Sequence, residues 1–540
     1  MTTQNDGPND APNDEILRPL DGVRILAAEQ MAALPFATQL LARLGAEVVK
    51  VEHPVTGDSG RGSQPFVTDP DGRQMGATFL RNNLNKRSVA IDLKHPEGVE
   101  LFLRMAPGFD VVGENFRAGT ADRLGIGYEA VRAVHPAVVY LSVSGFGQDP
   151  RSPYREMGAY AAVVEGMSGI YEYKRAPGRP PAANPVGALG DISSALFGAV
   201  GILAALRHRD LTGTGQHIDV AMLDSTVAMT DIVANFQSMG IEREWGSGVG
   251  IVETFEAADG HFVLQCVREH HFEVLMAEIG RPDLLDDERL ATRAGWQDHL
   301  DDLLRPAIES WSTGRTLVEV VETLSGAGIA CGPSRTSAQV VTDPHLGIRN
   351  MLIETLPSAT GQPVLVPGNP VKLSEVPEAA DARVPWLGEH TYEVLAAELF
   401  GAKRGAVPGA VQARAGLLQK ADRGTLFLNG VDALSPAMQL QLLHVMTEGS
   451  FQPLGGNETL TTSARLLFGA HRDLRGRLMV PVHWGMFALG PHPWEEPAQR
   501  AAAEADRLGV DLLAPQIGQL LTIDGELPRD RWWDKLAPTR

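Results

Sequence analysis

The chain has 540 residues, 44% of them hydrophobic, which is enough for more than one globular core. Its formal net charge of −20 argues against a general nucleic-acid binder or a binder of anionic membranes, so an anionic ligand needs a local cluster of cations. The two cysteines, Cys266 and Cys331, provide neither a disulfide framework nor the spacing of a metal site, and we expect no bound metal.

Two further features bear on where the protein works. Residues 1–15 are rich in Asn, Asp and Pro and lack the regions of a signal peptide, so we expect a disordered lead. The longest uncharged apolar run, 192–206, is too short to span a bilayer. The sequence thus predicts a soluble, cytoplasmic protein with neither nucleic acid nor membrane as a partner.

Strand and helix patterns alternate in the first part of the chain. Strands are expected at 23–29, 46–52, 88–93, 110–114 and 137–143, and helices at 35–44, 96–105 and 128–134. This alternation predicts βαβ units and an α/β fold with a doubly wound parallel sheet. Ligands of such sheets bind beyond the carboxyl ends of the strands, here after Glu52, Glu114 and Ser144.

After about residue 226 the pattern changes. A hairpin over 253–266 and helices between 271 and 324 predict a second, smaller α+β domain. Strands at 328–333 and 366–373 follow, and a helix at 389–398 ends this part of the chain near residue 400.

Asp191 stands at the start of the most apolar segment of the chain. From Ile192 to Leu206 no residue is charged, which predicts a helix buried on nearly every side. A carboxylate in the first turn faces unpaired N–H groups and the positive end of the helix dipole, and both favour its ionised form. Taken alone, this pattern favours an ordinary N-cap.

The residues around this segment point to a different role. Gly190-Asp191, the helix, a Thr-Gly-Thr-Gly turn at 212–215 and the strand that follows closely resemble the signature of family III CoA-transferases. The resemblance covers about 16–400, and its other matching segments are 20–26, 33–52, 114–125, 366–371 and 387–390. It implies that Asp191 is the catalytic nucleophile.

The same resemblance implies the activity and the architecture. CoA would pass from an acyl-CoA donor to a carboxylic acid acceptor through a mixed anhydride on Asp191, which divides one difficult step into easier ones. The family fold is an interlocked homodimer with a large doubly wound domain and a smaller α+β domain. The expected domain boundaries are 16–225 and 341–400 for the large domain and 226–340 for the small one.

CoA is the one cofactor-like group that the resemblance implies, as part of the acyl-CoA substrate. The expected CoA-binding residues are Asn115, Arg123, Lys86, Arg87, His53 and Ala33. Lys86 and Arg87 directly precede a strand and suit the adenosine phosphates. Leu34 stands where the family usually has a glycine, so backbone approach to the nucleotide is less open there.

Three alternatives remain at this point. The α-methylacyl-CoA racemases share the fold but need a histidine base where this chain has Tyr160, which is a far weaker base. The second alternative is a non-catalytic fusion product. The third is a regulatory protein whose C-terminal part still binds other proteins.

That C-terminal part resembles two other families. Residues 401–478 resemble a truncated fragment of the AAA+ enhancer-binding activators, with 424–430 as the Walker B strand. Asn429-Gly430 replaces the acidic pair there and no Walker A motif precedes it, so we expect no ATPase. Residues 479–540 resemble the end of metallo-β-lactamase-fold hydrolases, but His483 is a single zinc ligand and does not make a site.

Overall fold

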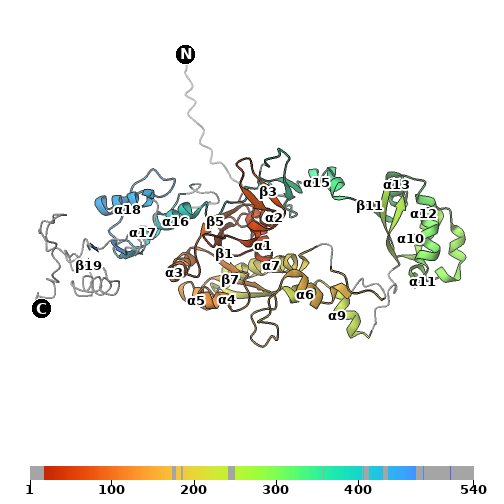
Figure 1. Ribbon diagram of the computed structural model, residues 1–540, viewed down its shortest axis with the longest axis horizontal. Helices are drawn as coiled ribbons and strands as arrows, with labels where there is room; N and C mark the ends of the chain where they lie inside the picture. The colour runs from red at the N-terminus through yellow and green to blue at the C-terminus, as the bar shows by residue number, and fades with distance from the viewer. Residues whose placement is uncertain are drawn as a thin grey trace, which may run out of the picture. The chain divides into compact units, whose positions relative to one another are not determined.

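Figure 1 shows a computed structural model of the chain. It describes residues 17–172, 178–183, 187–240, 250–356, 358–403, 406, 413–429, 436–469, 478–479 and 511–512. The predicted disordered lead therefore lies outside the described residues. The chain divides into two compact units, the first ending at Val394 and the second beginning at Leu395.

The first unit is built on a six-stranded parallel sheet with the order β5-β2-β1-β6-β7-β8. Its strands are β1 (Arg24–Ala28), β2 (Glu47–Glu52), β5 (Lys86–Ala90), β6 (Val111–Glu114), β7 (Val139–Ser144) and β8 (Gln216–Ala221). Strands β2, β6 and β7 are buried along their whole length, as expected for a sheet covered on both faces. The predicted doubly wound α/β fold is confirmed.

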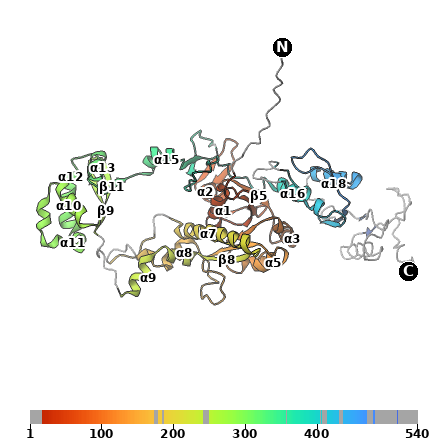
Figure 2. The ribbon, with the colours of Figure 1, turned by 180° about the vertical axis from the view of Figure 1, so that it is seen from behind.

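Helices connect and follow these strands. They are α1 (Ala33–Arg43), α2 (Ala77–Asn82), α3 (Pro96–Met105), α4 (Thr120–Leu124), α5 (Tyr128–Val134), α6 (Ala161–Met167), α7 (Leu189–Thr212), α8 (Met222–Ala228) and α9 (Asp231–Ser238). Helices α1 and α7 pack against each other (Figure 2), and α7 also packs on β7 and β8. The apolar side chains of these elements form the main core. A short hairpin of β3 (Phe66–Thr68) and β4 (Gln74–Gly76) precedes α2.

The strand order reverses between β1 and β6. From β1 the chain proceeds outward to β2 and β5, and from β6 it proceeds in the other direction to β7 and β8. The loops that leave β1 and β6 therefore turn apart and leave a crevice beyond the strand ends. These loops carry Gln30-Met31 and Asn115-Phe116.

The predicted smaller α+β element is present between residues 251 and 334. Strands β9 (Ile251–Ala257), β10 (Gly260–Cys266) and β11 (Ala330–Ser334) form an antiparallel sheet, and the main helices are α10 (Glu269–Glu278), α11 (Arg293–Asp298), α12 (Arg305–Ser312) and α13 (Leu317–Gly326). It has its own core, in which the rings of Phe272 and Trp296 stack with centroids 4.2 Å apart.

Two predicted strands differ from the observed ones. The strand expected at 88–93 begins earlier, at Lys86. The strand expected at 366–373 is only β13 (Leu365–Pro367), paired with β12 (Leu352–Glu354). Pro367 and Pro370 explain the short β13, because proline lacks the N–H that a longer strand pairing needs. Short helices α14 (Ser337–Val340) and α15 (Pro344–Ile348) precede this pair.

The second unit has a core of its own. Helices α16 (Thr391–Phe400), α17 (Leu417–Lys420) and α18 (Pro436–Glu448) accompany the parallel pair β14 (Thr425–Asn429) and β17 (Arg465–Gly469). Leu399 and Phe400 are buried in this core, so the unit begins before the boundary expected after residue 400. β14 coincides with the expected Walker B strand, whereas His483 lies outside the described residues.

Helix α7 is the single helix in the described part of the chain with the length and composition to cross a membrane. This is weak evidence for a membrane span, because the core helix of a soluble protein passes the same test. α7 packs along β7 and β8, which accounts for the apolar side chains on its buried face without a bilayer.

The separate cores predict that the first unit folds without the second. A chain ending at residue 400, with Leu399→Ser and Phe400→Ser to replace side chains left uncovered, should keep the cooperative unfolding transition of the first unit. Calorimetry of the full-length and shortened proteins measures this. Loss of the transition on shortening would show that the first unit depends on the second.

Candidate active site

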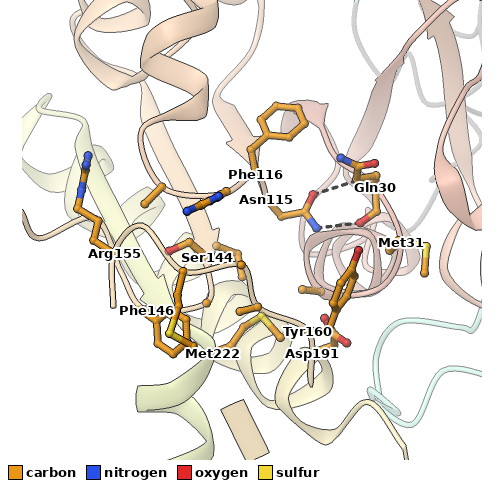
Figure 3. A pocket seen from close by; sticks show the side chains of 18 of the residues that line it. Gln30, Met31, Asn115, Phe116, Ser144, Phe146, Arg155, Tyr160, Asp191 and Met222 are labelled. Atoms are coloured by element: carbon orange, nitrogen blue, oxygen red, sulfur yellow. Dashed lines mark hydrogen bonds between the residues drawn. The ribbon is translucent and has the colours of Figure 1, made fainter. Parts of the chain in front are cut away.

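A cavity of about 300 Å³ opens beyond the carboxyl ends of β1, β6 and β7 (Figure 3). It lies at the reversal of strand order, where the fold leads us to expect a ligand. Its lining residues are Gln30, Met31, Ala33, Ser59, Asn115, Phe116, Arg117, Ala118, Val143, Ser144, Gly145, Phe146, Arg155, Met157, Gly158, Ala159, Tyr160, Asp191 and Met222. The cavity thus combines apolar walls with two arginines and one carboxylate.

Asn115 ties together the two loops at the crevice. Its Oδ1 accepts the backbone N–H of Gln30 at 2.9 Å, and its Nδ2 donates to the Gln30 carbonyl at 2.8 Å (Figure 3). The amide therefore replaces the strand pairing that the diverging loops lack. Asn115 lines the cavity, in accordance with its expected place in a CoA site.

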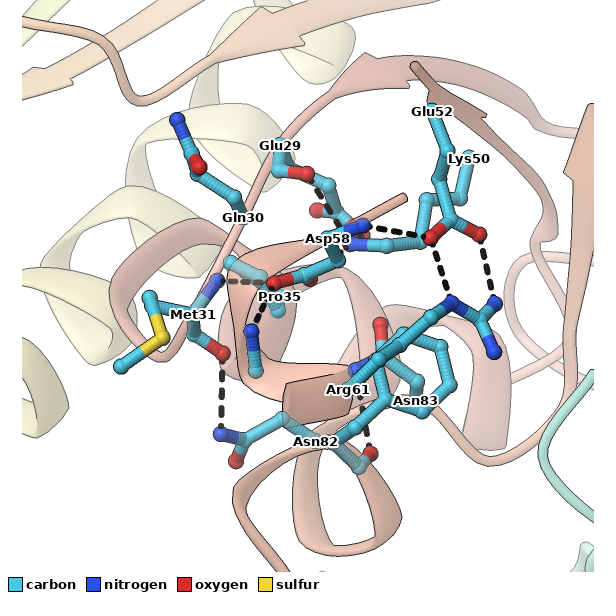
Figure 4. Close-up of polar contacts among 12 residues, drawn as sticks. Glu29, Gln30, Met31, Pro35, Lys50, Glu52, Asp58, Arg61, Asn82 and Asn83 are labelled. Carbon is cyan, nitrogen blue, oxygen red and sulfur yellow. Dashed lines mark hydrogen bonds and ion pairs between the residues drawn. The ribbon is translucent and has the colours of Figure 1, made fainter. Parts of the chain in front are cut away.

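A network of buried charges supports the wall of the cavity at Met31, which has a left-handed backbone with φ of 64° (Figure 4). Asp58 accepts the Met31 N–H at 2.9 Å, and Asn82 donates to the Met31 carbonyl at 3.2 Å. Lys50 lies 2.7 Å from the second oxygen of Asp58. Burial alone would lower the pKa of Lys50, but Asp58 and Glu29 outweigh it, so the pKa is raised and the ammonium form persists.

Asp191 reaches the cavity from the first turn of α7. The N-cap of α7 is Ala188, so the interpretation of Asp191 as an N-cap is wrong. Among the residues that the structure describes, none forms a hydrogen bond to its carboxylate, which leaves both oxygens available to a substrate.

The electrostatics of Asp191 also differ from expectation. Burial, together with the charge of Glu165, raises the pKa of Asp191 to about 6, and Arg81 opposes this shift. This shift is opposite to the one expected from the start of the helix, and its largest cause is the loss of water around the buried carboxylate. Raised pKa values of this kind are typical of functional carboxylates in clefts.

Lys86 and Arg87, which were expected to bind the adenosine phosphates, do not line the cavity. The Lys86 side chain is fully buried and its Nζ lies 2.6 Å from Glu29. Arg87 is buried between Glu47 and Glu393. Both residues lie on β5, whose side chains point into covered faces of the sheet, and their charges are neutralised within the protein.

The remaining expected residues divide into two groups. Ala33 lines the cavity, and the neighbouring Leu34 points into the core against Gly113, so Leu34 does not obstruct the cavity wall. Arg123 and His53 do not line the cavity. Arg123 is exposed on α4 and donates to Thr120, and the His53 ring accepts N–H groups of the turn that follows it.

Sequence reasoning missed both cations of the cavity, Arg117 and Arg155. Arg117 lies within the segment 114–125, two residues after Asn115, so the resemblance of that segment could have pointed to it. Arg155 belongs to a loop rich in charged residues, and nothing in its pattern distinguishes it from surface arginines. Tyr160, at the racemase histidine position, is 76% exposed and lines the same cavity.

The geometry predicts a structural effect for Lys86. Lys86→Met should lower the free energy of unfolding by about 3 kcal/mol, because it leaves the buried Glu29 carboxylate short of a partner. Denaturant titration measures this, and the double variant with Glu29→Gln should recover part of the loss. An unchanged stability with a weakened affinity for CoA would instead restore the phosphate-binding role.

Comparison with known proteins agrees with this geometry. The model of CoA-transferase family III matches residues 20–391, and that of the Sigma-54 interaction domain matches residues 386–480. The second match supports the resemblance of 401–478 to enhancer-binding activators. The resemblance of 479–540 to metallo-β-lactamase-fold hydrolases stays a prediction.

Individual relatives match about 70% of the chain. Succinyl-CoA:mesaconate CoA-transferase of Haloarcula hispanica is 35% identical over 389 residues, which are 70% of this chain and 95% of the relative. Succinate–glutarate CoA-transferase of Agrobacterium fabrum is 33% identical over 411 residues, 74% of this chain and all of the relative. A CAIB/BAIF family protein of Brucella suis matches in structure with a TM-score of 0.62 and 32% identity, over 70% of this chain and 99% of its own. The chain belongs to CoA-transferase family III.

Proposed function

We propose that the protein transfers CoA from an acyl-CoA to a carboxylic acid, with Asp191 as the nucleophile. The observation that carries this proposal is the position of Asp191, a carboxylate without a hydrogen-bond partner among the described residues, in a cavity at the reversal of strand order. Membership of the family, and relatives named as CoA-transferases, support the enzyme class.

The reaction can be written with Asp191 as a carrier. An Asp191 oxygen joins the thioester carbonyl carbon, the C–S bond breaks, and CoA thiolate leaves with the electron pair. The thiolate then attacks the aspartyl carbonyl of this mixed anhydride, which releases the donor acid and leaves CoA on Asp191. The acceptor carboxylate next attacks the aspartyl carbonyl, which forms a second anhydride and releases the CoA thiolate. The thiolate then attacks the acceptor carbonyl, which gives the new acyl-CoA and restores the Asp191 carboxylate.

The cavity residues supply binding and orientation. Arg117 and Arg155 are placed to hold phosphate or carboxylate groups of the substrates, since guanidinium groups suit both. Phe116, Val143 and Phe146 offer apolar surface to the pantetheine arm and acyl chain. The Asn115–Gln30 pair keeps the two loops at a fixed spacing while CoA enters and leaves.

Short dicarboxylic acids are the substrate class that we propose. These two relatives act, by their names, on succinyl-CoA with mesaconate and on succinate with glutarate, and all three acyl groups, succinyl, mesaconyl and glutaryl, carry a second carboxylate. Two arginines beside one nucleophilic carboxylate suit such substrates better than fatty acids. A racemase is less well supported, because Tyr160 is not a base of suitable strength.

We further propose a homodimer that works in the cytoplasm. Helix α7 exposes an apolar stripe of Leu196, Phe197, Val200 and Leu203, and a surface of this kind is typical of a protein interface. The two cysteines are free thiols, which suits a reducing compartment.

The nucleophile can be tested by substitution. Asp191→Asn should leave the fold intact, because Asp191 is not the N-cap, but should lower the transfer rate by at least about a thousandfold. Transfer between succinyl-CoA and a panel of dicarboxylic acids, followed by mass spectrometry, measures this. An Asn variant that remains active, once deamidation back to Asp is excluded, would contradict the mechanism.

The raised pKa of Asp191 predicts a pH dependence. Only the ionised carboxylate attacks, so acylation by succinyl-CoA should fall about tenfold per pH unit as the pH drops below about 6. Above that pH the rate should level off as far as Asp191 is concerned. An acid limb near pH 4, the ordinary range of aspartate, would show that the buried environment of Asp191 is absent in solution.

A further inference from the structure

Glu165 is a buried carboxylate on α6, beside the start of the helix that carries Asp191. It is only 1% exposed. Its Oε1 accepts the backbone N–H of Gly190 at 3.1 Å, and its Oε2 accepts the hydroxyl of Tyr171 at 3.0 Å. Glu165 therefore holds the residue directly before Asp191, and it occupies a helix N–H that would otherwise be free to stabilise an oxyanion.

Close packing keeps the two carboxylates near each other. A Cβ atom on Gly190 would lie 2.7 Å from Val164 Cγ2 and 3.3 Å from Ala161 Cα, so α6 is in direct contact with the first turn of α7. Among the described residues, the charged groups that shift the pKa of Asp191 are Glu165 from α6 and Arg81 from α2. Two like charges in a partly buried site repel each other, because little water screens them.

We propose that Glu165 is a positioning residue that also drives Asp191 towards its acylated form, an inference that rests on the proposed nucleophilic role of Asp191. When the aspartyl oxygen bonds to the acyl carbon and the C–S bond breaks, the negative charge passes from Asp191 to the departing sulfur. The repulsion between the two carboxylates then ends. Glu165 thus destabilises the free carboxylate of Asp191, whereas the anhydride linkage formed from it carries no charge for Glu165 to repel.

The raised pKa of Asp191 is consistent with this role. A proton neutralises Asp191 as an acyl group does, so the same repulsion favours both forms. Removing the charge of Glu165 while keeping its hydrogen bond to Gly190 should therefore change protonation and acylation together. If Glu165 had a purely structural role, removing its charge would not shift the protonation and the acylation of Asp191 together.

Glu165→Gln is the decisive variant, because glutamine keeps an acceptor oxygen for Gly190 and a similar volume. Acylation by succinyl-CoA is followed by rapid quenching and intact-protein mass spectrometry across pH. We expect the acid limb to move down by about 0.5 pH unit, and the acylated fraction at equilibrium with added CoA to fall about threefold. Glu172→Gln, which removes the same charge from an exposed position, should leave both unchanged.

The outcomes separate this inference from the proposed function. If the wild-type protein never carries an acyl group or CoA on Asp191, the nucleophilic role of Asp191 fails. If acylation occurs and the acid limb of Glu165→Gln equals that of the wild type, the inference alone is contradicted. Should Glu165→Gln not fold, Glu165→Met provides a second neutral variant with the same expected shift. Glu165→Asp keeps the charge and should keep the wild-type acid limb, and a downward shift in this variant would also contradict the inference.

Discussion

The reversal of strand order between β1 and β6 is the constraint on which the site depends. The chain leaves β1 towards one edge of the sheet and leaves β6 towards the other edge. The loops that follow these two adjacent strands therefore separate beyond the strand ends. In this protein the resulting crevice is stabilised by side chains in place of strand pairing. Asn115 bridges the loops, and the ion pairs of Lys50 with Asp58 and Glu29 hold the left-handed turn at Met31.

Asp191 is placed by a second constraint, the contact between α6 and the start of α7. Gly190 permits the approach of the helices, and Glu165 binds the Gly190 N–H. The proposed nucleophile is consequently held through the backbone of the preceding residue, while none of the described residues forms a hydrogen bond to its carboxylate. A half-buried carboxylate beside a second one is costly for stability, and proteins commonly accept such a cost at functional sites.

Much of the fold could be predicted from residue patterns, because the buried strands of a parallel sheet are short apolar runs separated by amphipathic helices. The resemblance also led directly to Asp191, Asn115 and Ala33, which all line the cavity. The buried ion pairs of Lys86 and Arg87 could not be predicted. A cation before a strand looks the same whether it meets a phosphate or a distant carboxylate, and Glu29 and Glu393 approach them only through tertiary packing.

The central claim is that Asp191 forms mixed anhydrides with the acyl groups of donor and acceptor. Exchange of oxygen between the acceptor acid and Asp191 tests this claim most directly. In the proposed reaction, each turnover transfers one oxygen of the acceptor acid to the Asp191 carboxylate. With an acceptor labelled with oxygen-18, the peptide that contains Asp191 should gain the mass of the heavy isotope during turnover with acyl-CoA, and not without acyl-CoA. Transfer of CoA without label in that peptide would contradict the account.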